Sequence, residues 1–224
     1  MKKYCPLPFK FNNDIMVTNE IRKQILQGFS KLMDYPGESL QKEAESLEEI
    51  ITLFFSEPAE DLRKFITYLE TTESGRLEEI YSGTFDISPT CFPYVGYLLF
   101  GESFKRGEFL SKMIEKFREY NYTVESKELP DHVSVILKFL STLDPSDQLA
   151  RELHVDGLLP SFKHLQDSFK KNIEKDQNNP YYYLIRSCNS VLNLMLYGED
   201  EIEIEKKLKE SKPPKPPKFP EGAN

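Results

Sequence analysis

The amino-acid sequence predicts an all-α protein that folds as a single-domain bundle of about eight to ten helices. Glycine makes up only 10 of the 224 residues, and most prolines outside the last dozen positions are isolated, so the body of the chain contains few residues that break helices. Along that body, apolar side chains recur three and four positions apart, which is the helical period. No segment alternates apolar and polar residues for long enough to predict a sheet.

The first half of the predicted bundle contains four helices. Residues 1–18 include several Pro and Asn residues and are expected to form an irregular arm. The first helix ends at Tyr35-Pro36-Gly37, a stop and turn signal, and Ser39 is placed to cap the second. A break at Ser56-Glu57-Pro58 separates the second helix from the third. The four apolar stripes consist of Ile21, Ile25, Phe29, Leu32 and Met33; Leu40, Ala44, Leu47, Ile51 and Phe54; Leu62, Phe65, Ile66 and Leu69; and Leu77, Ile80 and Tyr81.

The second half begins with an irregular stretch and then continues as helices. Pro89 and Pro93 forbid a long helix there, whereas residues 94–100 are apolar enough to form a short buried one. Ser103 opens the next helix, and Asn179 before a proline is typical of an N-cap. The apolar stripes consist of Leu110, Met113, Ile114 and Phe117; Val133, Ile136, Leu137 and Leu140; Leu158, Phe162, Leu165 and Phe169; and Leu184, Cys188, Val191, Leu192 and Met195.

The helical domain is therefore expected to span residues 19–197, with a flexible tail over residues 198–224. The tail is acidic at first and then contains the run KPPKPPKFP, which favours polyproline II and cannot build a core. This composition is compatible with a disordered tail and with a docking site for a partner that binds polyproline II.

The net charge of −8 at pH 7 disfavours several classes of partner. An acidic chain with no basic patch repels phosphate backbones, which argues against nucleic-acid binding, whereas basic partners are electrostatically suited. No apolar window approaches the length of a membrane span, and the N-terminus lacks the apolar core of a secretory signal. Cys5, Cys91 and Cys188 are odd in number and widely spaced, which is typical of a reducing compartment. We therefore expect a cytoplasmic protein.

The sequence lacks the motifs of common enzymes and metal proteins. His132, His154 and His164 have neither the spacing nor the cysteine partners of a zinc site. The glycine-rich motifs of dinucleotide, phosphate and hydrolase sites are absent as well. The sequence therefore predicts a protein without catalytic activity and without a metal site.

A first cluster of candidate residues covers Gly101, Glu102, Ser103, Arg106 and Gly107. Arg106 projects from the core-facing side of its helix near the N-terminus, where the helix dipole disfavours a cation, so it needs an acidic partner. Gly107 inside a helix costs about 1 kcal/mol relative to Ala, which suggests the close approach of another backbone. An ion pair that joins two helices is the simpler interpretation, and ligand binding is the alternative.

A second cluster is the segment Glu128-Leu129-Pro130-Asp131-His132. Pro followed by Asp before an apolar helix is typical of a helix start, so Asp131 is expected to accept backbone N–H bonds there. Glu128 and His132 flank the same helix entrance. A carboxylate, an imidazole and a helix N-terminus placed together form the edge of a polar pocket that suits a peptide backbone or an arginine head group. Simple capping and such a pocket remain alternatives.

These clusters belong to an order of motifs that resembles a known family. The motifs are Tyr35-Pro36, Thr84-Phe85-Asp86, Gly101-Glu102-Ser103-x-x-Arg106-Gly107, Leu129-Pro130-Asp131-His132 and Asn179-Pro180-Tyr181-Tyr182. Over residues 20–196 the sequence is similar to the nitrate-reductase delta-subunit chaperones, the NarJ branch of the NarJ/TorD/DmsD-type redox-enzyme maturation proteins.

The resemblance implies an all-helical chaperone without catalytic activity and without a permanently bound cofactor. Such proteins bind the apo catalytic subunit of a molybdenum-bis-MGD oxidoreductase, typically through its N-terminal segment, and assist cofactor insertion before docking or export. Many of these segments carry twin-arginine signals. A permanent structural or adaptor subunit of a redox complex is the alternative function.

The resemblance also places partner-peptide binding at both clusters. The Pro130-Asp131-His132 element is implicated in recognising the peptide, and carboxylates such as Glu128 or Asp131 are expected to meet its arginines. We expect a monomer or weak homodimer. The candidate peptide-binding residues are Glu128, Leu129, Pro130, Asp131, His132, Gly101, Glu102, Ser103, Arg106, Gly107 and Tyr97.

Overall fold

The structure is a computed structural model that describes residues 17–87, 89–171 and 179–195. Within these residues it contains ten α-helices, one π-helical segment and no β-strand, which confirms the all-α class and the predicted number of helices. The expected arm and tail fall almost entirely on residues 1–16 and 196–224, which lie outside the described residues. The elements are α1 (Asn19–Leu32), α2 (Leu40–Thr52), α3 (Ser56–Glu70), α4 (Ser74–Phe85), α5 (Val95–Phe100), α6 (Phe104–Glu119), α7 (Val133–Thr142), α8 (Gln148–Glu152), the π-helix η1 (Leu153–Leu158), α9 (Leu159–Lys171) and α11 (Tyr181–Leu194).

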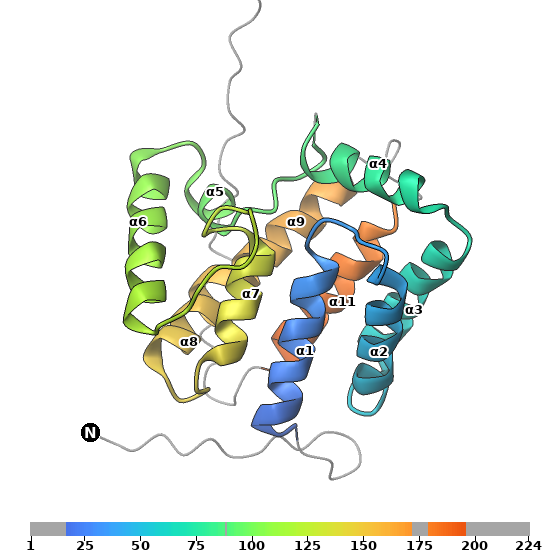
Figure 1. Ribbon diagram of the computed structural model, residues 1–224, viewed down its shortest axis with the longest axis horizontal. Coiled ribbons are helices and arrows are strands. Elements are labelled where there is room, and N and C mark those ends of the chain that lie inside the picture. The colour runs from blue at the N-terminus through green and yellow to red at the C-terminus, as the bar shows by residue number, and fades with distance from the viewer. Residues whose placement is uncertain (1–16, 88, 172–178, 196–224) are drawn as a thin grey trace, which may run out of the picture.

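The helices pack around one hydrophobic core (Figure 1). α1 packs against α2 and α7, α3 packs against α2 and α11, and α9 packs against α11. The rings of Phe29, Phe65, Phe139 and Phe162 are buried in this core, and each comes from a different helix. The predicted apolar stripes mostly face inward, and removing their surface from water is the main stabilising contribution.

α6 lies at one edge of the bundle, where it packs mainly against α5 (Figure 1). Met113 and Phe117 are buried, as expected, and the Phe117 ring centroid lies 4.8 Å from that of Phe139. Ile114, expected on the same buried face, is 41% exposed, so this part of the prediction is wrong. An edge helix has neighbours on one side only, and apolar spacing does not tell where the bundle ends.

The starts of two helices test the capping predictions. Ser39 precedes α2, but its side chain makes no capping hydrogen bond because its backbone is already helical rather than extended. The Asn179 side chain accepts a hydrogen bond from the Tyr181 N–H at 3.0 Å, which confirms its predicted role before α11. The π-helical turn η1 was not predicted. Pro160 follows it and lacks the N–H that a regular helix would bond to residue 156.

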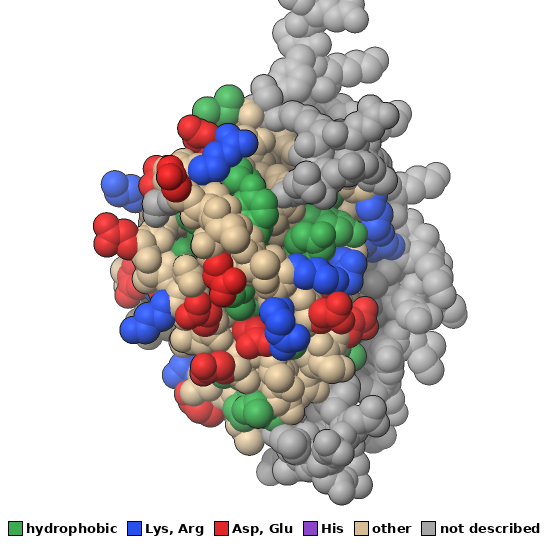
Figure 2. All heavy atoms as spheres, turned by 90° about the vertical axis from the view of Figure 1, so that its right-hand side faces the viewer, with side chains coloured by type: hydrophobic (Ala, Val, Ile, Leu, Met, Phe, Trp, Pro, Cys, Tyr) green, Lys and Arg blue, Asp and Glu red, His purple; other side chains and the backbone are tan. Residues whose placement is uncertain are grey.

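The face formed by α2, α3 and α4 mixes acidic and basic side chains (Figure 2). Arg63 of α3 pairs with Glu48 of α2, and Arg76 pairs with Glu79 within α4. Exposed pairs of this kind contribute little to stability. They do place basic side chains among the more numerous acidic ones of these three helices.

Among the described residues, the side chains of Cys91 and Cys188 are both buried, and burial raises the pKa of the Cys188 thiol. None of the described helices is long and apolar enough to cross a membrane.

Candidate functional site

A short antiparallel backbone pairing brings the two candidate clusters together. The Val95 N–H donates to the Asp131 carbonyl at 2.7 Å, and the Val133 N–H donates to the Pro93 carbonyl at 2.8 Å. Residues 93–95 thus lie beside residues 131–133, and we call this pairing the clasp. Because the clasp stands at the starts of both α5 and α7, it fixes how these helices approach each other.

The side chains of Arg106 and Asp131 form an ion pair across the clasp. Arg106 Nε lies 3.1 Å from Asp131 Oδ2, and the Asp131 side chain is fully buried while that of Arg106 is 21% exposed. The Arg106 guanidinium also lies 5.4 and 5.7 Å from the ring centroids of Tyr94 and Tyr97. The expectation that Arg106 needs an acidic partner is confirmed, and that partner comes from the second cluster.

The capping role expected for Asp131 is wrong. His132 occupies the N-cap of α7, and its Nδ1 accepts a hydrogen bond from the Ser134 N–H at 3.2 Å. Asp131 lies one position too early to reach those N–H groups, so its carboxylate turns to Arg106 instead. A Pro-Asp pair before a helix therefore predicted the right helix start but the wrong capping residue.

His132 is a buried, uncharged member of the site. Its Nδ1 also lies 2.7 Å from Ser134 Oγ, and its ring stands edge-on to that of Tyr94 at 5.2 Å. Burial lowers the pKa of His132 to about 3, because the charged imidazolium would lose its hydration. His132 and Asp131 therefore shape the site from within, and neither presents a side chain to solvent.

Glycine at position 96 allows this close packing. A Cβ atom on Gly96 would lie 2.8 Å from Asp131 Oδ2 and 3.0 Å from Phe109 Cδ1. A Cβ atom on Gly107 would meet nothing within 4 Å, so the close approach expected at Gly107 is wrong. Gly101 ends α5 with a φ of 64°, a conformation that favours glycine at the turn into α6.

The two glycines provide a matched pair of substitutions. We expect Gly96→Ala to lower the free energy of unfolding by at least about 1 kcal/mol, because the new methyl group overpacks a buried carboxylate. We expect Gly107→Ala to raise it by up to about 1 kcal/mol, because alanine favours an exposed helical position. Urea denaturation followed by circular dichroism measures both. Equal effects of the two substitutions would contradict the close contact at Gly96.

Acidic side chains gather on the surface beside the clasp. We call Asp34, Glu78, Asp86 and Glu128 the acidic face; within the described residues none of the four forms an ion pair. The Tyr94 hydroxyl donates to Glu128 Oε2 at 3.1 Å. Partial burial raises the pKa of Glu128, this hydrogen bond opposes the rise, and the charges of Asp34 and Asp86 add to it. The charges of Asp34 and Asp86 thus act on Glu128, and those of Glu78 and Asp86 act on Tyr35, so this surface favours a cation.

Exposed apolar side chains lie in the same segments as these carboxylates. Tyr35, Ile87 and Leu129 are 52%, 73% and 47% exposed, and each directly follows an acidic residue of the face in sequence. The Tyr35 hydroxyl donates to Glu78 Oε2 at 3.4 Å. Acidic and apolar groups therefore share one surface, which suits a segment that is both basic and partly apolar.

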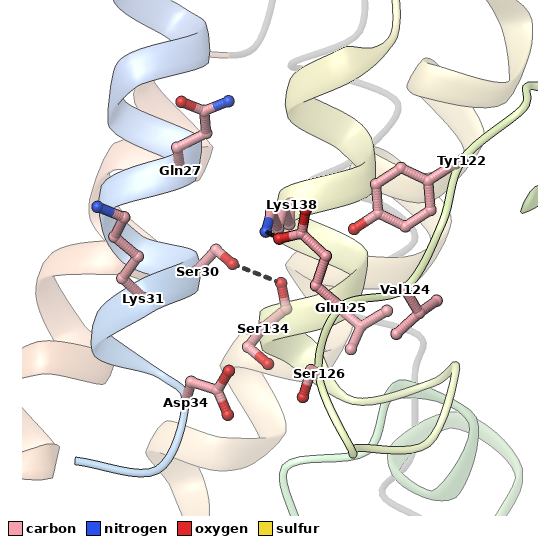
Figure 3. Close-up of a pocket in the computed structure, with 11 residues that line it drawn as sticks. Gln27, Ser30, Lys31, Asp34, Tyr122, Val124, Glu125, Ser126, Ser134 and Lys138 are labelled. Carbon is pink, nitrogen blue, oxygen red and sulfur yellow. Dashed lines mark hydrogen bonds and ion pairs between the residues drawn. The ribbon is translucent and has the colours of Figure 1, made fainter. Parts of the chain in front are cut away.

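A groove of about 350 Å³ opens between α1, α7 and residues 122–126 (Figure 3). On its floor, Ser30 Oγ donates to the Ser134 carbonyl at 2.8 Å. Asp34 lines the groove and also belongs to the acidic face, so the two features meet at this residue.

The structure brings together only part of the predicted set. Arg106, Tyr97, Asp131 and His132 meet at the clasp, and Glu128 reaches it through Tyr94. Glu102, Ser103 and Gly107 are exposed at the start of α6, and Leu129 and Pro130 lie on the segment before the clasp. A role of any of these residues in binding a peptide stays a prediction.

The sequence did not single out Tyr94, Gly96, Asp34 or Glu78 as site residues, and it pointed to Asp86 only as part of the Thr84-Phe85-Asp86 motif. One signal was available for Tyr94, because it precedes Tyr97 by three positions, which places both rings on one side of a short helix. The others depend on neighbours distant in sequence. Among the described residues, no group of three or more His, Cys, Asp or Glu side chains is arranged to hold a metal ion.

The sequence is similar to known proteins of one family. The sequence model of the family described as "Nitrate reductase delta subunit" matches residues 55–174, just over half of the chain. The nitrate reductase molybdenum cofactor assembly chaperone NarJ of Escherichia coli K12 is 27% identical over 121 residues, which cover 53% of this chain and 51% of NarJ. NarJ of Escherichia coli O157:H7 matches to the same extent, so the chain spans about half the length of the curated relatives it matches.

A solved structure also resembles this chain. It is the crystal structure of an Archaeoglobus fulgidus protein assigned to redox enzyme maturation, with a TM-score of 0.49 and 23% sequence identity. The match covers 83% of this chain and 97% of that one.

Proposed function

The chain belongs to the nitrate reductase delta subunit family, and on this basis we propose that it is an assembly chaperone for the catalytic subunit of a molybdenum-bis-MGD oxidoreductase. It binds the apo subunit through the N-terminal segment and assists cofactor insertion before docking or export. It acts in the cytoplasm as a monomer or weak homodimer. It has no catalytic activity and holds no cofactor permanently, because the cofactor belongs to the client.

The observation that carries this proposal is the acidic face with its apolar neighbours. The four carboxylates have no ion-pair partner among the described residues, and the charges of Asp34 and Asp86 act unfavourably on that of Glu128, so a basic segment would stabilise this surface. The exposed side chains of Tyr35, Ile87 and Leu129 offer apolar contact to the same segment. An apo subunit whose N-terminal segment is basic and partly apolar therefore fits this surface.

The clasp has a positioning role in this proposal. Asp131 and His132 are buried, so they contact no client directly. The Arg106–Asp131 pair instead holds the backbone pairing that fixes Tyr94, and Tyr94 holds Glu128 by its hydroxyl. The Pro130-Asp131-His132 element thus contributes to client binding indirectly, because it holds Tyr94 and Glu128 in the positions where the client contacts Glu128.

The first test is capture of partners from native lysate with the tagged chain, followed by measurement of their molybdenum content. Recovery of a molybdopterin-enzyme catalytic subunit without molybdenum supports the chaperone. Recovery of the same subunit fully loaded overturns it in favour of a permanent structural subunit. Recovery of no such subunit, from cells that express one, also overturns it.

Neutralising two carboxylates of the acidic face tests the site. We expect Asp86→Asn/Glu128→Gln to weaken binding of the captured apo subunit by about tenfold, because two attractive charges are lost. The amide oxygen introduced at position 128 still accepts the Tyr94 hydroxyl, so the fold is preserved. The matched control is Glu49→Gln/Glu70→Gln, which removes two exposed charges from α2 and α3. Isothermal titration calorimetry compares the variants, and equal weakening by both would place the client elsewhere.

A further inference from the structure

The groove between α1 and α7 carries one carboxylate that lacks a cationic partner. Its two lysines are engaged, because Lys31 pairs with Glu43 at 3.3 Å and Lys138 pairs with Glu125. Asp34 has no ion pair among the described residues, and only its Oδ1 is used, by the N–H of the next residue at 2.9 Å. Figure 3 shows the Asp34 carboxyl group turned from the end of α1 toward the α7 side of the groove.

Three serine hydroxyl groups line the same groove as this carboxylate. Ser134 and Ser30 are more than nine-tenths buried on the groove floor, and Ser126 lies on the facing loop (Figure 3). Ser126 Oγ accepts the Glu128 N–H at 3.1 Å, and a hydroxyl oxygen has a second lone pair for another donor. The groove thus offers several hydroxyl acceptors together with one carboxylate, Asp34, that has no ion pair among the described residues.

Part of the lining is apolar or aromatic, and Gln27 adds one further polar side chain. Val124, Val135 and the ring of Tyr122 line the groove beside the hydroxyl groups. This combination suits a long side chain with an apolar stem and a cationic head that has many donors. The volume of about 350 Å³ is of the size that holds one small ligand or a few side-chain groups.

We propose that this groove binds a guanidinium group, an arginine side chain of the client segment, with Asp34 as its counterion. The proposal rests on the proposed function for the source of the arginine, and it adds a specificity site to the acidic face. A guanidinium presents five N–H donors in a planar fork that matches a carboxylate and neighbouring hydroxyl oxygens, and its plane stacks on an aromatic ring. An ammonium is a compact, strongly hydrated charge that uses fewer of these acceptors.

The position of Asp34 explains how one segment reaches both surfaces. Its charge acts on Glu128 and on Tyr81, so it lies at the border between groove and acidic face. Ser126 lines the groove and holds the backbone of Glu128, which joins the two from the opposite side. A client segment with one arginine in the groove therefore continues directly onto the acidic face.

The test uses blocked amino acids as probes, so it does not depend on the identity of the client. Acetyl-arginine amide, acetyl-lysine amide and acetyl-citrulline amide are titrated into the full chain labelled with ¹⁵N, and NMR records amide shifts. We expect saturable shifts at Ser30, Asp34, Ser126 and Ser134 with the arginine probe. Citrulline has the same shape without the charge and is expected to give none, and lysine is expected to bind more weakly by several fold.

A pair of variants assigns the effect to Asp34. We expect Asp34→Asn, which keeps the oxygen that accepts the local N–H bond, to weaken arginine binding by about tenfold. Glu45→Gln removes the same charge from an exposed position of α2 and is expected to leave binding unchanged.

Each other outcome overturns the proposal. These outcomes are the absence of saturable shifts in the groove, equal binding of arginine and lysine, and shifts confined to the acidic face around Glu128. They leave the proposed function intact if the apo client is still captured. Conversely, arginine binding in the groove without capture of any molybdoenzyme subunit would refute the proposed function alone.

Discussion

Replacing Arg106 by Met is expected to lower the free energy of unfolding by about 3 kcal/mol. The substitution leaves the Asp131 carboxylate fully buried without its counterion, while Asp131 Oδ1 already has no hydrogen-bond partner within the described residues. It also removes the cation from between Tyr94 and Tyr97. The expected loss is at the low end for a buried pair because a fifth of the Arg106 side chain remains in contact with water. Urea denaturation followed by circular dichroism at pH 7 gives the value.

An exposed pair provides the control for this substitution. Arg76→Met removes the partner of Glu79 on the surface of α4, where both side chains are about two-thirds exposed, and is expected to cost less than about 1 kcal/mol. The double variant Arg106→Met/Asp131→Asn removes both charges of this pair, so no unpaired carboxylate stays buried at the clasp and we expect part of the loss to be recovered. If Arg106→Met costs no more than Arg76→Met, the clasp does not depend on its ion pair.

Most of the fold follows from the sequence because apolar spacing reports directly which side of a helix is buried. Ile25 and Phe29, four positions apart, are both completely buried in α1. The same logic fails at α6, where Ile114 has the right spacing but no neighbour to cover it. Apolar spacing records the period of a helix, whereas burial also depends on the position of that helix in the bundle.

The site was harder to predict because a residue next to a helix start can be explained either by local capping or by a contact with a residue distant in sequence. The need of Arg106 for an acidic partner follows from its place at a helix start, but Asp131 lies 25 residues away and had a local explanation as a cap. The two helical glycines, Gly107 and Gly96, differ in their tertiary surroundings. A glycine within a helix is visible in the sequence, yet only the tertiary neighbours decide that Gly96 is the one in close contact.

The acidic face and the groove could be recognised only from the fold, because their residues are distant in sequence. Asp34, Asp86 and Glu128 are widely separated in sequence, and each taken alone is an ordinary solvated carboxylate. They act on one another only because the turn after α1, the segment after α4 and the segment before the clasp meet on one surface. The negative net charge predicted a basic partner, but the surface that we propose for that partner became visible only in the structure.

Acidification from pH 7 to pH 5 is expected to lower the free energy of unfolding by about 2 kcal/mol through His132 alone. Burial lowers the pKa of His132 from its ordinary value of 6.5 to about 3 in the folded protein. Below pH 6.5, His132 therefore binds a proton in the unfolded chain but stays neutral in the folded protein. The stability that depends on neutral His132 is present above pH 6.5 and is lost as the pH falls toward 3, by up to about 1.4 kcal/mol per pH unit.

The variant His132→Asn separates this effect from those of other titrating groups. Asparagine is a good N-cap, so it keeps an acceptor for the Ser134 N–H, but it does not titrate. Glu128 acts in the opposite direction, because a pKa raised by burial favours the folded state as the pH falls, and it is present in both proteins. We therefore compare urea denaturation of the two proteins at pH 7 and pH 5 and expect the natural chain to lose about 2 kcal/mol more than the variant. Equal losses would mean that the folded protein accepts a proton on His132, and the site would then hold a cation beside Tyr94 where we place a neutral ring.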